Sequence, residues 1–256
     1  MKRLIFLISI PLIFSFTVNA AELDRAAVER QLADAKGKTV ADLRRKDLRD
    51  LDLSGLDFSH ADLWGSDLRR SNLSKSNLSG LNLDLTVMTK IDLSEANLAN
   101  TSIFGVHMAG ANLSKANLSN SRFIANLDRA NLSQANLKNA NWGVDMKNQP
   151  MGLMRVSLNN ANLSGADLTD ADLNRALLRH ADFSNSLLHN TVLAGSDMSS
   201  ANFNNADLTG ADLSNCNLTD ADFTGANVTN TRFSANDKSA VKSLQKSKNL
   251  ASTIFQ

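Results

Sequence analysis

The sequence predicts an all-β solenoid of about ten short coils, with a short helical segment at each end. From Ala41 to about Phe233 the chain repeats a five-residue unit of a small residue, Asp or Asn, Leu or Phe, and two polar residues. A period of five fits neither an isolated helix, with about 3.6 residues per turn, nor a strand, with a period of about two. Aromatic residues recur at intervals of twenty, and most glycines occupy one position of the unit. These three observations together predict a repeat architecture.

The central apolar residue of each unit, here called the centre, recurs every five residues from Leu43 to Phe123. One residue is lost near Ile124, and one is gained across the irregular segment 143–152, after which the pattern resumes at Leu153. Twenty residues make four units, so we expect a four-sided coil in which residues twenty apart stack. This interpretation places the following centres in one ladder: Ile103, Phe123, Trp142, Leu163, Phe183, Phe203 and Phe223.

The positions of the glycines indicate a tight turn between successive sides of the coil. Nine of the twelve lie two places after a centre, and two others, Gly143 and Gly152, flank the irregular segment. A tight turn with a positive φ angle favours glycine, which adopts that conformation without strain. Neither Pro11 nor Pro150 lies in a regular unit, as expected if each unit donates backbone hydrogen bonds to its neighbours.

The pattern also predicts what fills the coil. Centres point inward, together with the small residue two places before each of them, and every buried Leu or Phe contributes roughly 1.5–3 kcal/mol. Cys216 occupies a small position, so we expect a buried, unreactive thiol. The Asp or Asn before each centre is expected to bond to local backbone. Bulky residues replace the small one at five positions, where the coils should bulge: Leu51, Leu56, Leu81, Ile91 and Val106.

The repeated motif A-[DN]-L-x-x, clearest between Ala161 and Leu173, resembles that of the pentapeptide-repeat protein family. The resemblance covers about Ala41 to Phe233. It implies a right-handed quadrilateral β-helix, and the handedness rests on the resemblance alone.

The first twenty residues have the features of a secretory signal peptide. Lys2 and Arg3 precede an apolar stretch from Leu4 to Phe16, and small residues end at Ala20. The stretch is short for a membrane span of roughly 20 residues, so cleavage after Ala20 is favoured over an uncleaved anchor. No later segment is apolar enough to span a membrane. The sequence therefore predicts a periplasmic or extracellular protein.

Charge argues against a nucleic-acid partner. The full chain has 27 basic and 26 acidic residues, and signal removal takes away two basic ones, which leaves a net charge of −1. A nucleic-acid-binding protein would show a basic excess.

The ends and the interruption carry open alternatives. Residues 21–40 are expected to form a helical cap, with helical spacing over Glu22–Lys36, and residues 234–256 a helix from Asp237 to about Lys248 and a partial closing coil. Both helices are interpreted as caps on the solenoid, although the second one would also suit pairing of two subunits, as in some members of the resembled family. The loop 143–152 is either a recognition element or a tolerated irregularity.

The candidate binding site is a row of outward apolar residues. Trp64, Phe104 and Ile124 follow their centres at intervals of twenty, where most units have a polar residue, and Leu85 lies beside the gap in this row. The row continues toward Val144 and Met146. Contiguous exposed apolar surface often marks an interface, and Trp is enriched at binding hot spots. The alternative is that the N-terminal helix or the loop covers the row.

No catalytic or metal-binding constellation is evident. The four histidines fall on different sides or distant coils. Six aspartates precede successive centres from Asp42 to Asp67 and have many arginines among them, so structural roles are favoured over Ca²⁺ binding. The chain has no Tyr and no arrangement of nucleophile and base that the repeat would bring together. We therefore expect a protein that is not an enzyme and needs no cofactor or metal.

These observations predict an exported, non-catalytic scaffold of the cell envelope that binds an unidentified protein or associates with itself. The alternative is a mimic of DNA that modulates a topoisomerase, since some pentapeptide-repeat proteins present acidic rods to these enzymes. The export signal and the near-neutral charge disfavour that alternative.

Overall fold

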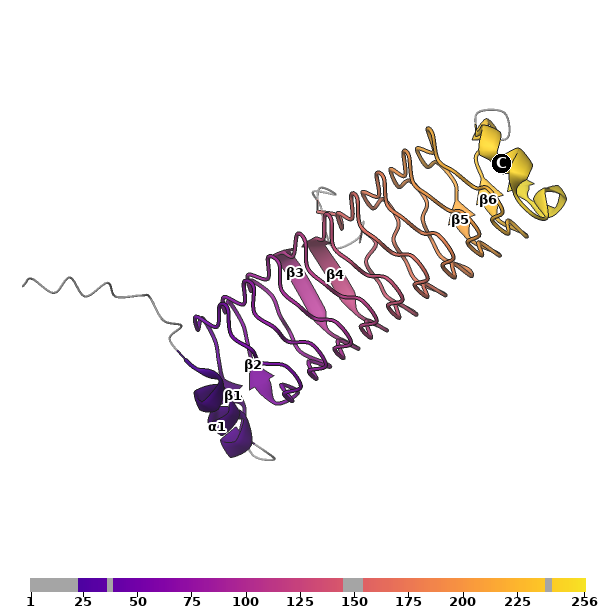
Figure 1. Ribbon diagram of the computed structural model, residues 1–256. Coiled ribbons are helices and arrows are strands. Elements are labelled where there is room, and N and C mark those ends of the chain that lie inside the picture. The colour runs from indigo at the N-terminus through magenta and orange to yellow at the C-terminus, as the bar shows by residue number, and fades with distance from the viewer. Residues whose placement is uncertain (1–22, 36–38, 145–153, 238–240) are drawn as a thin grey trace, which may run out of the picture.

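The chain winds into a stack of short coils that forms an elongated rod (Figure 1). The computed structural model describes residues 23–35, 39–144, 154–237 and 241–256. Along the rod the colour passes from indigo to yellow without reversal, so each coil contacts the coils before and after it. This is the sequential stacking that the five-residue repeat predicts.

Residues twenty apart pair in parallel on each of the four sides of a coil. We number the sides 1 to 4 after the first-coil centres Leu43, Leu48, Leu53 and Phe58. The corresponding pairs are Ala41 with Ala61, Asp47 with Asp67, Asp52 with Asn72, and Asp57 with Asn77. Each centre donates its N–H to the next coil, as in the 2.9 Å bond from Leu48 to the carbonyl of Asp67.

Because a corner interrupts the backbone every five residues, most sides form single bridges and only a few form strands. The parallel strands are β1 (Ala41–Asp42) with β2 (Ala61–Asp62), β3 (Ser102–His107) with β4 (Arg122–Asn126), and β5 (Asp212–Leu213), β6 (Arg232–Phe233) and β7 (Ile254–Phe255). β3 and β4 are the longest, since the residue missing near Ile124 removes one corner. A register shift between Phe104 and Val106 accommodates the loss.

The corners adopt the predicted turn. The nine glycines that lie two places after a centre all have φ between 65° and 74°. Twenty-five other residues in the described chain also have positive φ, and about half of them are Asn or Asp, which tolerate this conformation best. The turn closes with a bond such as that from the Ser66 N–H to the Leu63 carbonyl, at 3.0 Å.

The bore is apolar and densely packed. The centres of the described coils are buried, and so are most of the small residues. Where Ser or Thr replaces Ala inside, its hydroxyl bonds to a backbone carbonyl, as Ser66 does to Leu63 at 2.7 Å. The outward Asp and Asn side chains accept the N–H two residues on, as Asn72 does from Ser74 at 2.9 Å. Both results match the roles that the repeat predicts for these positions.

The single aromatic ladder predicted from the sequence is wrong, because Trp142 and the Phe183–Phe203–Phe223 stack lie on different sides of the bore. Trp142 stacks on Phe123 on side 1, with ring centroids 4.7 Å apart. Its next neighbour is Leu173, since the Trp142 N–H bonds to the Asp172 carbonyl at 2.8 Å. The stack of Phe183, Phe203 and Phe223, with centroids 5.0 and 4.8 Å apart, lies on side 3.

The reason is the length of the interruption. Leu163 follows Leu132 on side 3, since Asn131 pairs with Asn162. The step from Trp142 to the centre of the next side, Leu158, takes 16 residues instead of five, so the interruption adds eleven residues. Leu153, expected to be a centre, lies outside the described residues.

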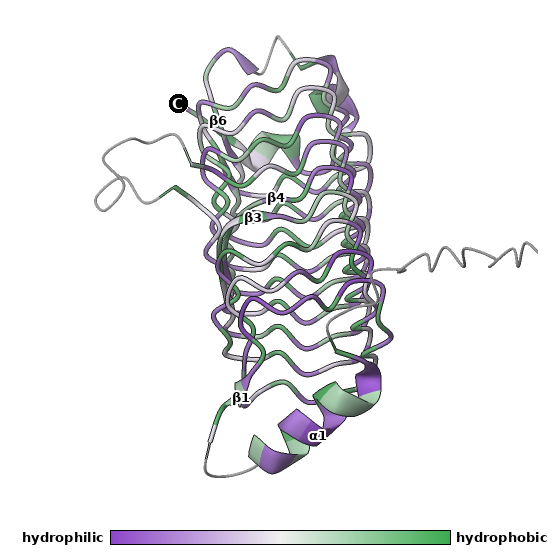
Figure 2. Ribbon diagram, turned by 90° about the vertical axis from the view of Figure 1, so that its left-hand side faces the viewer, coloured by the Kyte–Doolittle hydropathy of each residue, from purple (hydrophilic) through white to green (hydrophobic). Residues whose placement is uncertain are grey.

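The N-terminal end of the rod is crossed by α1 (Arg25–Ala35), which lies under the first coil (Figure 2). Asp24 caps it by accepting the N–H of Ala27 at 2.7 Å. Val28 and Ala35 are buried against the core. Arg25 donates to the carbonyls of Asp52 and Ser54, at 2.9 and 3.2 Å, and so takes the place of a preceding coil on side 3.

The C-terminal end closes with two 3₁₀ turns, η1 (Lys242–Lys246) and η2 (Leu250–Ser252), followed by β7. The sequence predicts an α-helix to about Lys248, whereas Lys242–Lys246 forms a 3₁₀ turn that follows the edge of the last coil. Lys248 pairs with Asn227, and Phe255 pairs with Phe233, at coil positions. These pairings explain why a longer helix does not form there.

Candidate functional site

Three of the predicted partner-binding residues lie together near the N-terminal end of side 1. Trp64 belongs to the second coil, Leu85 forms the corner after side 1 in the third, and Phe104 belongs to β3 in the fourth. Leu85 is 55% exposed and Phe104 is 38% exposed, while Trp64 is half-buried. Asp84 fills the gap in the row and accepts the N–H of Phe104 at 2.8 Å. These residues form an apolar patch on an otherwise polar side.

The rest of the predicted row is not exposed. Ile124 is only 2% exposed and Val144 only 7%, so neither offers surface to a partner. Ile124 lies in β4, where the missing corner residue joins sides 1 and 2 into one strand and pairs Ile124 with Phe104. Met146 lies outside the described residues. The patch therefore ends at Phe104.

Sequence reasoning missed Val40, which is 63% exposed just before β1. Val40 and Trp64 line a shallow hollow of about 410 Å³, together with Arg44, Ala61, Asp62 and Asn82. The signal in the sequence is that Val40 is apolar and lies one place before the first unit, at a position that does not point into the bore. We call Val40, Trp64, Leu85 and Phe104 the Trp64 patch.

Trp64 is held in place from two directions. The Arg45 guanidinium lies over the indole, 4.9 Å from the ring centroid, at a distance typical of a cation–π contact. The backbone N–H of Trp64 donates to the Asp62 carboxylate at 3.0 Å, which fixes the backbone from which the ring projects. A half-exposed aromatic ring with fixed orientation loses little conformational entropy on binding, which suits a contact residue.

The acidic and basic residues beside the patch neutralise each other. Arg44 bonds to Asp42 at 2.8 Å and also approaches Asp62 at 3.6 Å, and Arg49 bridges Asp47 and Asp67 in the same way, at 2.6 and 3.6 Å. The hydrogen bond from Arg44 lowers the pKa of Asp42 to about 2, and that from Arg49 does the same for Asp47. Across the described residues, no three His, Cys, Asp or Glu side chains are grouped as metal ligands.

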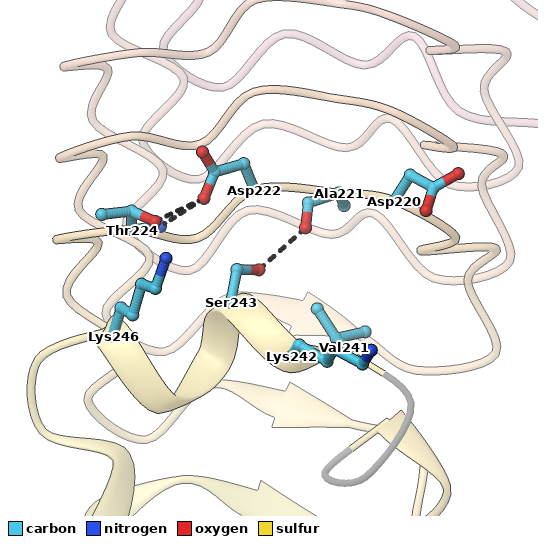
Figure 3. A pocket seen from close by; sticks show the side chains of 8 residues that line it. All are labelled: Asp220, Ala221, Asp222, Thr224, Val241, Lys242, Ser243 and Lys246. Carbon is cyan, nitrogen blue, oxygen red and sulfur yellow. Dashed lines mark hydrogen bonds between the residues drawn. The ribbon is translucent and has the colours of Figure 1, made fainter.

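A second hollow, of about 450 Å³, separates η1 from the last regular coil (Figure 3). Ser243 spans it by donating to the Ala221 carbonyl at 2.8 Å and accepting the Phe223 N–H at 3.1 Å. Lys246 points toward Asp222 and Thr224. Hydrogen bonding by Thr224 is the main reason that the pKa of Asp222 is lowered. Lysines and aspartates line this hollow together, so its charges select no one class of ligand.

Reactive groups are few in the described chain. Burial raises the pKa of the Cys216 thiol to about 12, and its Sγ lies 3.2 Å from the Leu193 carbonyl. His189 approaches Asp207 at 3.1 Å on the rod surface. Neither group lies near the Trp64 patch in the coil order. In the part of the chain that the structure describes, no helix combines the length and apolar character needed to cross a bilayer.

The stacked parallel coils, with one corner every five residues, define the class of the protein as a parallel β-solenoid. The family model for pentapeptide repeats matches in eight copies, over residues 41–70, 52–89, 91–124, 125–143, 157–195 and 196–234. The protein therefore belongs to the pentapeptide repeat family. Known structures in this family are right-handed quadrilateral β-helices.

Solved structures with related folds include three that differ in setting. HetL from the cyanobacterium Nostoc sp. strain PCC 7120, a protein involved in regulation of heterocyst differentiation, is 31% identical, with 80% of this chain and 96% of HetL covered and a TM-score of 0.44. QnrB1, a plasmid-mediated fluoroquinolone resistance protein, is 21% identical, with 77% and 97% covered and a TM-score of 0.51. A thylakoid lumen protein of Arabidopsis thaliana is 30% identical, with 45% and 66% covered and a TM-score of 0.23. No curated protein matches the sequence.

Proposed function

We propose that the protein is an exported, non-catalytic scaffold of the cell envelope that binds a protein partner through the Trp64 patch. The observation that carries this proposal is the exposure of Leu85 and Phe104 on neighbouring coils, beside the fixed indole of Trp64. In this fold the bore takes up the apolar side chains, so outward ones gain nothing from folding. Clustered outward apolar residues are typical of binding surfaces.

Export is proposed from the sequence of residues 1–20, with a basic start, an apolar stretch and a small-residue end at Ala20. The test is the N-terminal sequence of the protein recovered from a cell fractionation. A chain that begins at Ala21 in the periplasmic or extracellular fraction supports export. A cytosolic chain that retains Met1 refutes it and favours the topoisomerase alternative.

The coils beside the patch do not favour a mimic of DNA. Such a mimic needs unpaired carboxylates in regular rows, whereas Asp42, Asp47 and Asp50 are each bonded to an arginine. The likeness to QnrB1, at 21% identity, extends to the fold. We therefore keep protein binding through the apolar patch as the proposed function.

The proposed function is tested by affinity capture from envelope extract, with the mature chain as bait. The test variant is Leu85→Ser/Phe104→Ser, and the matched control is Leu187→Ser/Val192→Ser. The control removes two apolar residues of similar exposure, 41% and 37%, from a distant coil. We expect a protein that the wild type and the control retain and the test variant loses. Equal retention by all three chains would refute the assignment of the patch.

A further inference from the structure

The first strand of the rod, β1, has one paired edge and one outer edge. The N–H of Ala41 bonds to the His60 carbonyl and that of Leu43 bonds to the Asp62 carbonyl, both at 2.9 Å. Backbone groups of successive strand residues point to opposite edges. The N–H and C=O of Asp42 therefore point away from β2, to the N-terminal edge. In later coils the equivalent groups bond to the preceding coil, as the Asp67 N–H does to the Lys46 carbonyl at 2.9 Å.

The same edge is covered on side 3. There Arg25 places its two terminal nitrogens on the carbonyls of Asp52 and Ser54, which supplies the donors that a preceding coil would supply. On side 1, no described residue forms a hydrogen bond with Asp42 from the outer edge. Within the described residues, β1 thus presents the backbone groups of an unpaired strand, which template the addition of another strand.

A groove runs along this open edge. It has a volume of about 340 Å³ and lies between α1 and β1, lined by Gln31, Asp34, Ala35, Thr39, Val40, Ala41 and Asp42. The Oε1 atom of Gln31 is buried, and no described residue donates a hydrogen bond to it. Val40 also lines the hollow beside Trp64, so the groove is continuous with the Trp64 patch. A buried acceptor without a donor is costly unless a ligand supplies one.

The geometry favours a single strand over a second rod as the occupant. Coils stack about 4.8 Å apart, whereas a helix with its side chains is about 10 Å wide. Because α1 crosses the end of the rod, the end of another solenoid cannot approach to strand-pairing distance on all four sides (Figure 2). One extended segment needs only the edge of β1.

We propose that β1 accepts an extended segment of the partner polypeptide as an added strand, in the groove between α1 and β1. This inference rests on the proposed function and specifies how the partner binds. The segment alternates an amide or basic side chain with an apolar one. The amide or basic side chain faces outward beside Asp42, in the way that the Asn72 side chain donates to the Asp52 carboxylate of the adjacent coil at 3.1 Å. The apolar side chain faces the apolar side of α1 near Ala35. Backbone bonds supply affinity, and the side chains supply specificity.

The test uses a synthetic peptide with the sequence of residues 111–120, in which Ala111–Leu113 and Lys115–Leu118 have this alternation. Binding to the mature chain is followed by tryptophan fluorescence, because Trp64 is half-exposed beside the groove while Trp142 is buried. The test variant Asp42→Pro removes the outward N–H and leaves the bonds of Ala41 and Leu43 to coil two. The matched control, Asp42→Ala, removes the same carboxylate but keeps the N–H.

We expect the wild type to bind the peptide saturably. The Kd of Asp42→Ala should lie within about threefold of the wild-type Kd. The Kd of Asp42→Pro should be raised at least about tenfold, as loss of one backbone hydrogen bond predicts. Amide hydrogen exchange checks the wild type independently of any variant. The Asp42 amide should exchange as freely as an exposed group and slow at least about tenfold with the peptide, while Asp67 stays protected throughout.

The proposal is overturned if the peptide does not bind, if both variants bind it equally, or if Asp42 is already protected in the free protein. These outcomes are separate from the proposed function. If strand addition at β1 is refuted but partner capture still depends on Leu85 and Phe104, the Trp64 patch remains the partner-binding surface.

Discussion

The indole Nε1 of Trp142 donates a 3.0 Å hydrogen bond to the Oγ of Ser121, in the interior of the rod. Ser121 in turn donates to the Leu118 carbonyl at 2.6 Å. Trp142 is the largest fully buried side chain in the described chain, and the serine occupies a small position of the preceding coil. A smaller residue there gives the ring space, and the hydroxyl satisfies its polar atom, which is why a tryptophan fits in a bore of Leu and Phe.

We expect Ser121→Ala to lower the free energy of unfolding by about 1–3 kcal/mol, because it leaves the indole N–H buried without an acceptor. Ser114→Ala, at an outward position, should change it by less than about 0.5 kcal/mol. Urea unfolding of both variants measures the difference. Combining Ser121→Ala with Trp142→Phe should recover part of the loss, and a purely additive result would argue against the bond.

The five-residue period determines how much of the fold can be predicted from the sequence. It identifies which residues point into the bore, and burial of the centres and most small residues confirms this assignment. It does not identify the side of the rod to which a centre belongs, because all four sides carry the same motif. The residue lost near Ile124 and the eleven gained after Trp142 give a net gain of ten, which restores the phase of five but leaves the side undetermined. For this reason the repeat alone predicts that Trp142 stacks on Leu163, whereas Trp142 stacks on Leu173 in the structure.

The candidate site shows the same limit. Leu85 and Phe104 are exposed, as their positions in the unit predict. Ile124 occupies an outward position but is buried, because the corner after it is missing and the strand continues. Outward position in the motif gives exposure only where the coil is regular. The open edge of β1 is likewise invisible in the repeat, since it depends on how α1 crosses the end.

The backbone conformation of Leu85 is unfavourable for a leucine, so a role in binding explains the presence of this residue better than a role in stability. Its φ is 60°, in a region that costs a branched side chain roughly 1–2 kcal/mol, and its side chain is mostly exposed. We expect Leu85→Asn to leave stability unchanged or raise it by up to about 1 kcal/mol, since Asn tolerates this region. Thermal unfolding measures this. The same variant should weaken partner capture, and a marked fall in stability would contradict the interpretation.

Ser243 should hold the C-terminal segment to the rod. We expect Ser243→Ala to cost about 1 kcal/mol locally, because the Phe223 N–H and the Ala221 carbonyl both lose their partner. The control is Ser252→Ala, whose hydroxyl bonds to the nearby Asn249 carbonyl at the exposed surface. Amide exchange should accelerate in Lys242–Lys246 and at Phe223 for the first variant only. Unchanged exchange at Phe223 would show that water replaces the serine without loss.

The paired carboxylates of the first coil make a prediction about acid. Hydrogen bonds from Arg44 and Arg49 hold the pKa values of Asp42 and Asp47 at about 2 in the folded protein, below the ordinary value of 3.8. A depressed folded pKa stabilises the protein above the unfolded value, and this contribution is lost as the pH falls from about 3.8 to about 2. We expect the urea midpoint to fall across that range, and less steeply at high salt, which screens exposed pairs. Asp42→Asn/Asp47→Asn and Arg44→Gln/Arg49→Gln should both flatten the dependence, because each removes one half of the same pairs. If both variants remain as acid-sensitive as the wild type, the ion pairs of the first coil do not carry the effect.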